Sequence, residues 1–313
     1  MVKRLVAVLI AVALSVFAGA GVLAQEPADV LSAAVDYLVT IQNDDGGFSN
    51  GFAPESDLGT TADAVVALVA AGEDPNELRS ADGQTPLDHL GAQLDAGVAE
   101  GAGQLAKIVT AVVAAGQDPR DFAGHNLVDE LLALQDEEGV FGMGAFEHCL
   151  SLIALQNAGE TRPEGTVEAL VAAQNDDGGW GFVAGEASDT NTTGLCLQAL
   201  ALEDAPDAVE AALAYLAGIQ NEDGGWPYQN PSDFGTTSDA SSTALVIQAL
   251  VALGEDLEAW NAPDAFLLSL QEPSGAFRYQ SEIPGDNILA TVAAIPALAL
   301  VPLNYWVPVP VAE

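Results

Sequence analysis

Four aspartates stand just ahead of long apolar segments, at places where a carboxylate could bind a ligand or begin a helix. Aligning these segments by their shared ends puts the first three at equivalent places and the fourth close by: Asp57, Asp189, Asp239 and Asp286. A carboxylate at such a place can cap the free N–H groups of a helix. It can also join Tyr228 and Tyr279 from neighbouring segments in a polar collar for ligand hydroxyls, amides or a cation. Capping is the favoured interpretation, and both roles can coexist.

Histidine and cysteine offer little for nucleophilic catalysis. The chain has three histidines and no Gly-x-Ser-x-Gly sequence, so a hydrolase of the serine type is not expected. Its two cysteines, Cys149 and Cys196, each fall in a predicted apolar helix. We interpret them as buried small hydrophobic side chains, with a disulfide between them as the alternative. We therefore name no catalytic residue and no metal ligand.

A seven-residue sequence that begins with glutamine recurs along the chain. QNDDGGF at residues 42–48 returns as QNDDGGW at 174–180 and as QNEDGGW at 220–226. Weaker copies occupy 135–141 and 271–277, and a much eroded sixth is expected near Gln93. The glutamines are 39 to 51 residues apart. A period of that size is typical of stacked helix pairs or of a propeller.

The segments on either side of each motif favour helix pairs. Ala- and Leu-rich segments at helical spacing precede the motifs, further apolar runs follow them, and alternating β-branched strands are absent. First helices carry charges such as Asp36 and Glu168, whereas second helices are apolar nearly all round and should be buried. We predict an all-α fold, an α/α toroid (α6/α6 barrel) of six helix-pair repeats over residues 25–313. The charged helices should form its outer ring.

The motif Gln-x-x-x-Gly-x-Trp/Phe resembles the repeat of terpenoid cyclases, squalene-hopene cyclases and protein prenyltransferase β subunits, and cobalamin-carrier α domains share that toroid. The resemblance covers essentially the whole chain after residue 24. In that superfamily the glutamine and the aromatic brace one helix pair against the next. The resemblance therefore implies structural roles for Gln42, Phe48, Gln135, Phe141, Gln174, Trp180, Gln220, Trp226, Gln271 and Phe277.

The reactions that the resemblance implies need residues that this chain lacks. Class II cyclisation uses an Asp-x-Asp-Asp acid to protonate an alkene, but residues 189–192 and 239–242 supply one carboxylate each. Class I ionisation needs basic residues to hold a diphosphate, and only five Lys and Arg follow residue 24. Prenyltransferases hold zinc, for which Glu147, His148 and Cys149 are the nearest candidates. Adjacent helical side chains point about 100° apart and do not converge on one ion.

The start of the chain predicts export. Lys3 and Arg4 precede an apolar run from Leu5 to Phe17, and small residues follow up to Ala24. This pattern is typical of a signal peptide, here residues 1–24, and it predicts a secreted or extracytoplasmic protein. Net charge is −39, from 46 acidic and 7 basic residues. Such a surface repels phosphate backbones and anionic lipid, so nucleic acid and membranes are poor partners after signal cleavage.

We expect a non-catalytic toroid that binds a small molecule or a surface partner at its rim or in its central cavity, as a monomer. No cofactor is predicted, and a cobalamin-type ligand or zinc remains an alternative. The rival functions are enzymatic. One is a divergent prenyltransferase or terpenoid cyclase, and the other is a polysaccharide-active α/α barrel with paired carboxylates on its inner rim.

Overall fold

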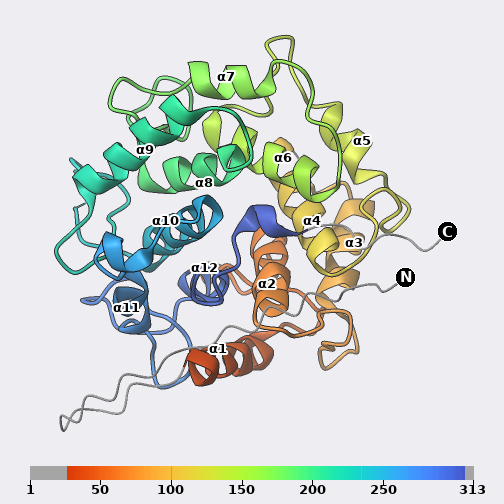
Figure 1. Ribbon diagram of the computed structural model, residues 1–313. Coiled ribbons are helices and arrows are strands. Elements are labelled where there is room, and N and C mark those ends of the chain that lie inside the picture. The colour runs from red at the N-terminus through yellow and green to blue at the C-terminus, as the bar shows by residue number, and fades with distance from the viewer. Residues whose placement is uncertain (1–26, 100, 234, 307–313) are drawn as a thin grey trace, which may run out of the picture.

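The chain forms two concentric rings of helices in a computed structural model (Figure 1). The structure describes residues 27–99, 101–233 and 235–306, so the expected signal peptide lies outside the described residues. The inner ring consists of α2 (Leu58–Ala70), α4 (Ala102–Ala114), α6 (Ala145–Asn157), α8 (Thr190–Leu200), α10 (Ala240–Leu253) and α12 (Ile288–Leu298). The outer ring consists of α1 (Pro27–Ile41), α3 (Pro86–Asp95), α5 (Leu127–Leu132), α7 (Thr166–Ala172), α9 (Pro206–Ile219) and α11 (Pro263–Leu268).

The inner ring is closed. Each inner helix packs against the inner helices of the two neighbouring repeats, and α12 of the last repeat packs against α2 of the first. The outer helix α1 also contacts α12. The predicted α/α toroid is therefore confirmed, and the described residues contain isolated β-bridges but no strand.

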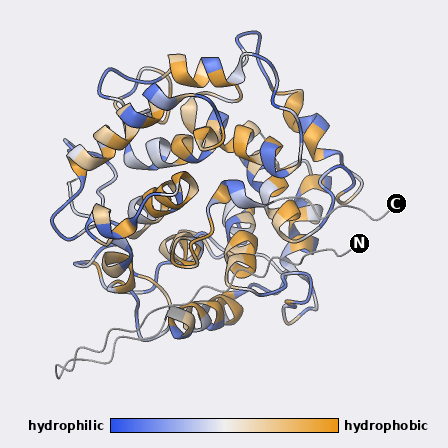
Figure 2. Ribbon diagram, in the orientation of Figure 1, coloured by the Kyte–Doolittle hydropathy of each residue, from blue (hydrophilic) through white to orange (hydrophobic). Residues whose placement is uncertain are grey.

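The two rings differ in polarity as the sequence predicts. Figure 2 shows that the inner helices α10 and α12 are largely hydrophobic and α8 is paler, while outer helices such as α5 and α9 mix hydrophobic and hydrophilic residues. In α10 the residues from Val246 to Leu250 are all buried, whereas α9 alternates buried and exposed positions. An inner helix touches neighbours on every side except the barrel axis, and it can therefore be apolar around most of its circumference.

Five of the six inner helices begin earlier than the apolar runs that predict them, and α12 begins at Ile288 as its run does. The run in α8 starts at Thr193, but the helix starts at Thr190, and α2 starts at Leu58 rather than Ala62. Threonine, serine and glycine fill these first turns and hide them from an apolar pattern. In α2 the hydroxyl of Thr61 is buried and accepts the Phe48 N–H of the turn that precedes the helix. The residues that the apolar pattern left out of the helices therefore have a structural role at the start of the helix.

Two expectations need correction. Gln93 lies inside α3 rather than at its end. The second repeat therefore lacks the motif turn, here called the corner, that follows the outer helix in the other five repeats. Cys149 and Cys196 form a disulfide, and the preference for two free cysteines was wrong. The helices α6 and α8 are neighbours in the inner ring, and the two Cα atoms are 5.1 Å apart. Sequence separation gives no sign of this proximity.

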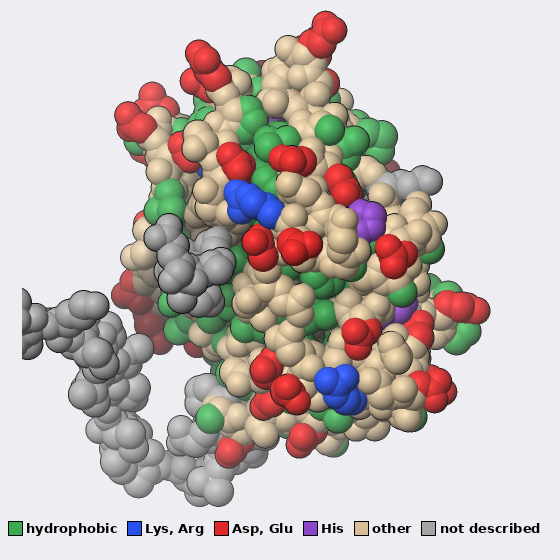
Figure 3. All heavy atoms as spheres, turned by 90° about the vertical axis from the view of Figure 1, so that its right-hand side faces the viewer, with side chains coloured by type: hydrophobic (Ala, Val, Ile, Leu, Met, Phe, Trp, Pro, Cys, Tyr) green, Lys and Arg blue, Asp and Glu red, His purple; other side chains and the backbone are tan. Residues whose placement is uncertain are grey.

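None of the described helices combines the length and the apolar character that crossing a membrane requires. Figure 3 shows one side of the molecule, where carboxylates are spread over the surface among few basic side chains.

Candidate functional site

The repeated glutamines brace neighbouring repeats. Gln174 Nε2 donates to the Gly178 carbonyl in its own turn at 2.7 Å and to the Ala208 carbonyl of the next outer helix at 2.8 Å. Gln271 does the same with Gly275 and with Val30 of α1, which joins the last repeat to the first. Gln220 follows the same pattern with Gly224 and Trp260, while Gln42 and Gln135 bond to their own turns at Gly46 and Gly139.

The five aromatic residues of the motif are wholly buried. They are Phe48, Phe141, Trp180, Trp226 and Phe277. Trp180 Nε1 donates to the Leu170 carbonyl at 2.9 Å and so ties the ring to the outer helix before it. Gly178 has a φ of +91°, and a Cβ there would lie 2.4 Å from the Ala211 carbonyl oxygen, so only glycine fits.

The acidic residues of the motif serve the turn as well. Asp177 Oδ1 accepts the Gly179 N–H at 3.0 Å and the Ser188 hydroxyl at 2.6 Å. Asp45 and Asp223 repeat this pair of bonds. The polar residues of the motif therefore hold the corner together.

His148 also has a structural role. In four repeats the backbone N–H of the motif aromatic donates to a threonine of the inner helix: Thr61, Thr193, Thr243 and Thr291. In the third repeat His148 Nδ1 accepts the Phe141 N–H at 3.1 Å, and its Nε2 faces the Thr166 carbonyl at 2.9 Å. Burial lowers the pKa of His148, which favours the neutral ring. Among the residues that the structure describes, no group of three His, Cys, Asp or Glu is arranged to hold a metal ion.

Three of the four rim aspartates cap inner helices. Asp189 Oδ1 accepts the Thr192 N–H at 2.7 Å and Oδ2 accepts the Thr192 hydroxyl at 2.8 Å, and Asp239 does the same with Ser242. Asp57 caps α2 through Thr60. Asp286 is exposed and accepts the Ser274 hydroxyl instead, while Asn287 caps α12. The capping interpretation holds for three of the four.

The two tyrosines contact the caps of the repeats before them. The Tyr228 hydroxyl hydrogen-bonds Asp189, and the Tyr279 hydroxyl hydrogen-bonds Asp239. Burial and the neighbouring carboxylate raise the pKa of each tyrosine to about 12. Because backbone N–H groups, hydroxyls and tyrosines already surround both carboxylates, these atoms have few lone pairs left for a ligand.

These buried carboxyls predict a pH dependence of stability. Burial raises the pKa of Asp189 and Asp239 to about 6, against 3.8 for the free group. Between about pH 4 and 6 the folded protein therefore binds more protons than the unfolded chain, and its stability falls as pH rises. The expected loss is on the order of 3 kcal/mol per carboxyl. We expect urea unfolding of the double variant Asp189→Asn, Asp239→Asn to show less of this loss than the unmodified chain.

The control for that comparison is Asp57→Asn, since Asp57 caps its helix in the same way but is only half buried. Asparagine also caps helices, so the exchange itself costs little. An identical fall of stability between pH 4 and 6 in the double variant and the unmodified chain would contradict the role of the buried carboxyls.

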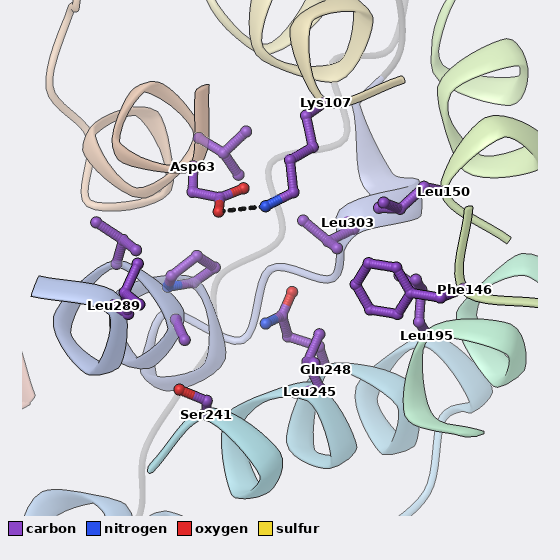
Figure 4. Close-up of a pocket in the computed structure, with 14 residues that line it drawn as sticks. Asp63, Lys107, Phe146, Leu150, Leu195, Ser241, Leu245, Gln248, Leu289 and Leu303 are labelled. Atoms are coloured by element: carbon purple, nitrogen blue, oxygen red, sulfur yellow. Dashed lines mark hydrogen bonds and ion pairs between the residues drawn. The ribbon is translucent and has the colours of Figure 1, made fainter. Parts of the chain in front are cut away.

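The barrel axis contains a cavity of about 190 Å³. A central cavity was expected from the sequence, but none of the residues that line it was singled out as a site residue. Every inner helix contributes to its wall (Figure 4), and most of the lining is aliphatic or aromatic. It reaches from the first turns of α6, α10 and α12, where Phe146, Ser241 and Leu289 lie, to Leu303 beyond the end of α12. The only sequence signal for it was the presence of charged residues in the otherwise apolar inner helices.

Four polar residues line this cavity: Asp63, Lys107, Ser241 and Gln248. Lys107 Nζ of α4 donates to Asp63 Oδ2 of α2 at 2.6 Å, and the two charges neutralise each other. Asp63 and Lys107 are 36% and 28% exposed, so solvent reaches the pair. Gln248 of α10 is only 2% exposed, and its Oε1 has no hydrogen-bond partner among the described residues. Figure 4 shows the Gln248 amide pointing into the cavity.

A short C-terminal segment closes one end of the barrel. The 3-10 turn η2 (Leu303–Tyr305) lies against α6, α8 and α10. Gln198 Oε1 accepts the Leu303 N–H at 2.8 Å, and Asn157 Nδ2 donates to the Leu303 carbonyl at 2.8 Å. The sequence of the chain's last residues contains Pro302, Pro308 and Pro310, and it is compatible both with packing across the barrel and with a free extended segment. Its described part, residues 301–306, packs onto the barrel.

The opposite rim exposes apolar side chains. The six loops that lead from outer to inner helices each carry one: Phe52, Val98, Met143, Phe182, Tyr228 and Ile283. Phe182 stacks on Phe146 with ring centroids 4.9 Å apart, and Phe146 lines the cavity. The apolar rim and the cavity wall are therefore continuous at this point.

Comparison with known proteins supports the fold. The family model described as the prenyltransferase alpha-alpha toroid domain matches residues 5–94, 99–226 and 145–304. A protein from Actinoplanes aligns with a TM-score of 0.64 and 20% identity, covering 88% of this chain and 98% of its own. The type II terpene cyclase MstE from Scytonema aligns at 0.61 and 18%, covering 87% and 97%. An unsaturated glucuronyl hydrolase specific for heparin aligns at 0.61 and 14%, covering 89% and 96%. No curated protein matches the chain in sequence.

Proposed function

The chain belongs to the prenyltransferase alpha-alpha toroid domain family, and on that basis we propose that its axial cavity binds a compact, mostly hydrocarbon molecule without transforming it. The observation that carries the proposal is the cavity itself, which is apolar, lined by every inner helix and furnished with few polar groups. Binding sites for small molecules are typically of this kind. The exposed apolar rim supports access for such a ligand from one side.

The polar groups of the cavity support binding over reaction. Protonation of an alkene requires an un-ionised acid. Asp63, the only carboxyl group among the lining residues, instead accepts a hydrogen bond from Lys107 Nζ at 2.6 Å. Hydrolysis of a glycosidic bond uses two carboxyl groups about 5 to 10 Å apart, and Asp63 is the only carboxylate among the lining residues. The volume of about 190 Å³ also lies below the roughly 300 to 1,000 Å³ of sites for drug-sized ligands.

An extracytoplasmic, monomeric protein is part of the same proposal. The basic and apolar start of the chain supports export, and the Cys149–Cys196 disulfide supports an oxidising compartment. The strongly acidic composition argues against nucleic acid and anionic membranes as partners.

The first experiment is native mass spectrometry of protein purified from its own source, which should show a retained small molecule. Toluene then serves as a probe, because cavities of about 150 Å³ with similar linings bind benzene. We expect toluene to bind saturably by calorimetry. The variant Ala293→Phe, which adds a ring to the cavity wall, should weaken that binding at least about tenfold by filling the space.

The control is Ala53→Phe, which adds the same ring to an exposed loop and should bind toluene as the unmodified chain does. Failure of toluene to bind would contradict the proposal. Incubation with squalene or prenyl diphosphates, with Mg²⁺ or Zn²⁺, should give no product. Turnover that is lost on Asp63→Asn, Asp189→Asn or Asp239→Asn would establish an enzyme of the family instead.

A further inference from the structure

Gln248 presents a buried acceptor to the cavity. Its side chain comes from α10, is 2% exposed, and points into the hollow (Figure 4). Its Oε1 is buried and has no partner among the described residues. Leaving a buried carbonyl oxygen without a donor is unfavourable, so such atoms usually face a group that can bond to them.

The corresponding glutamine in the neighbouring repeat shows which kind of group can bond to a side chain at this position. Gln198 of α8 stands nine residues after its capping Asp189, as Gln248 stands nine residues after Asp239. Gln198 Oε1 accepts the backbone N–H of Leu303 at 2.8 Å. The C-terminal segment thus supplies a donor to one glutamine of the pair and leaves the other facing the cavity.

We propose that Gln248 Oε1 accepts a hydrogen bond from the hydroxyl group of the ligand, so that the protein selects uncharged hydrocarbon alcohols. This inference rests on the proposed function of the cavity. Asp63 and Lys107 are already paired with each other, so a charged ligand would lose its hydration without gaining an opposite charge. A neutral molecule with a hydroxyl satisfies Gln248 and leaves that pair intact.

The test compares phenol with toluene, which differ by a hydroxyl in place of a methyl group. We expect phenol to bind the unmodified chain about 5- to 10-fold more tightly than toluene, which is the value of one net hydrogen bond. Benzoate and benzylammonium, which carry charges, should bind more weakly than phenol. Calorimetric titration gives all four affinities.

The variant Gln248→Met removes the acceptor and keeps a side chain of similar length. It should bind toluene at least as well as the unmodified chain and lose the preference for phenol. Because Oε1 has no partner to lose, the variant should also melt no lower than the unmodified chain. The control is Gln117→Met, which makes the same exchange at an exposed position outside the cavity and should keep the preference.

The outcomes separate the two proposals. Equal binding of phenol and toluene to the unmodified chain, or a phenol preference that survives Gln248→Met, would overturn the role of Gln248 while the cavity remains a binding site. Binding of neither compound would overturn the proposed function and this inference together.

Discussion

Replacing Trp180 or Trp226 with alanine is expected to lower the free energy of unfolding by about 3 to 5 kcal/mol. Both rings are wholly buried at the corners of their repeats. Each indole N–H also donates to a carbonyl of the preceding outer helix, Leu170 at 2.9 Å or Leu216 at 2.8 Å. Alanine would therefore leave a cavity and would also remove the donor of a buried carbonyl group.

Urea unfolding followed by far-ultraviolet circular dichroism measures this loss. The matched control is Phe52→Ala, which removes an aromatic ring from the loop that follows the first corner. Phe52 is 85% exposed, so its removal should change stability by less than about 0.5 kcal/mol. If the tryptophan variants unfolded at the same urea concentration as this control, the bracing role of the rings would be refuted.

The sequence predicted the fold well because the information about it is repeated. The five copies of the motif each combine a glycine in a turn, a glutamine that bonds to that turn and a buried aromatic, and in three copies the glutamine also bonds to the next repeat. Gln271 shows the consequence most directly, since its bond to Val30 closes the ring across the whole length of the chain. A chain with one such motif every 39 to 51 residues and one apolar helix in each repeat has few other folds that bury all of these apolar helices.

The residues that line the cavity could not be predicted in the same way. Asp63, Lys107 and Gln248 come from three different repeats. Gln248 has a counterpart in Gln198 of the neighbouring repeat, but Gln198 bonds to Leu303, so the recurrence does not mark a cavity. The meeting of the three lining residues depends on closure of the ring, which brings α2, α4 and α10 to one axis. The rim aspartates, in contrast, repeat and were found at once, but the structure shows that their repetition reflects helix capping.

The packing of the C-terminal segment on the barrel could not be predicted from the sequence either. The prolines of this segment were compatible both with packing across the barrel and with an extended chain, and the residues that hold it belong to other repeats. Asn157 and Gln198 lie near the ends of α6 and α8, and each bonds to the backbone of Leu303. The sequence signal for this contact is a polar residue near the end of each apolar helix, Asn157 in α6 and Gln198 in α8, where the C-terminal segment packs.

The disulfide provides the second large effect on stability. Cys149 and Cys196 are 47 residues apart and join neighbouring inner helices. By the entropy of loop closure, a cross-link of that span stabilises the folded chain by about 4 kcal/mol. The double variant Cys149→Ala, Cys196→Ala should lose an amount of that order, because its unfolded chain gains freedom while the helices keep their other contacts.

Reduction of the unmodified chain offers an independent route to the same state. With a phosphine reductant, the unmodified chain should unfold at a urea concentration close to that of the double variant, and the variant should not respond to the reductant. The bridge is wholly buried, so reduction is expected to require partial unfolding and to proceed slowly in native buffer. If the double variant were as stable as the oxidised chain, the disulfide would contribute nothing to stability, and this prediction would be wrong. The disulfide would then also be weaker support for the proposed extracytoplasmic location.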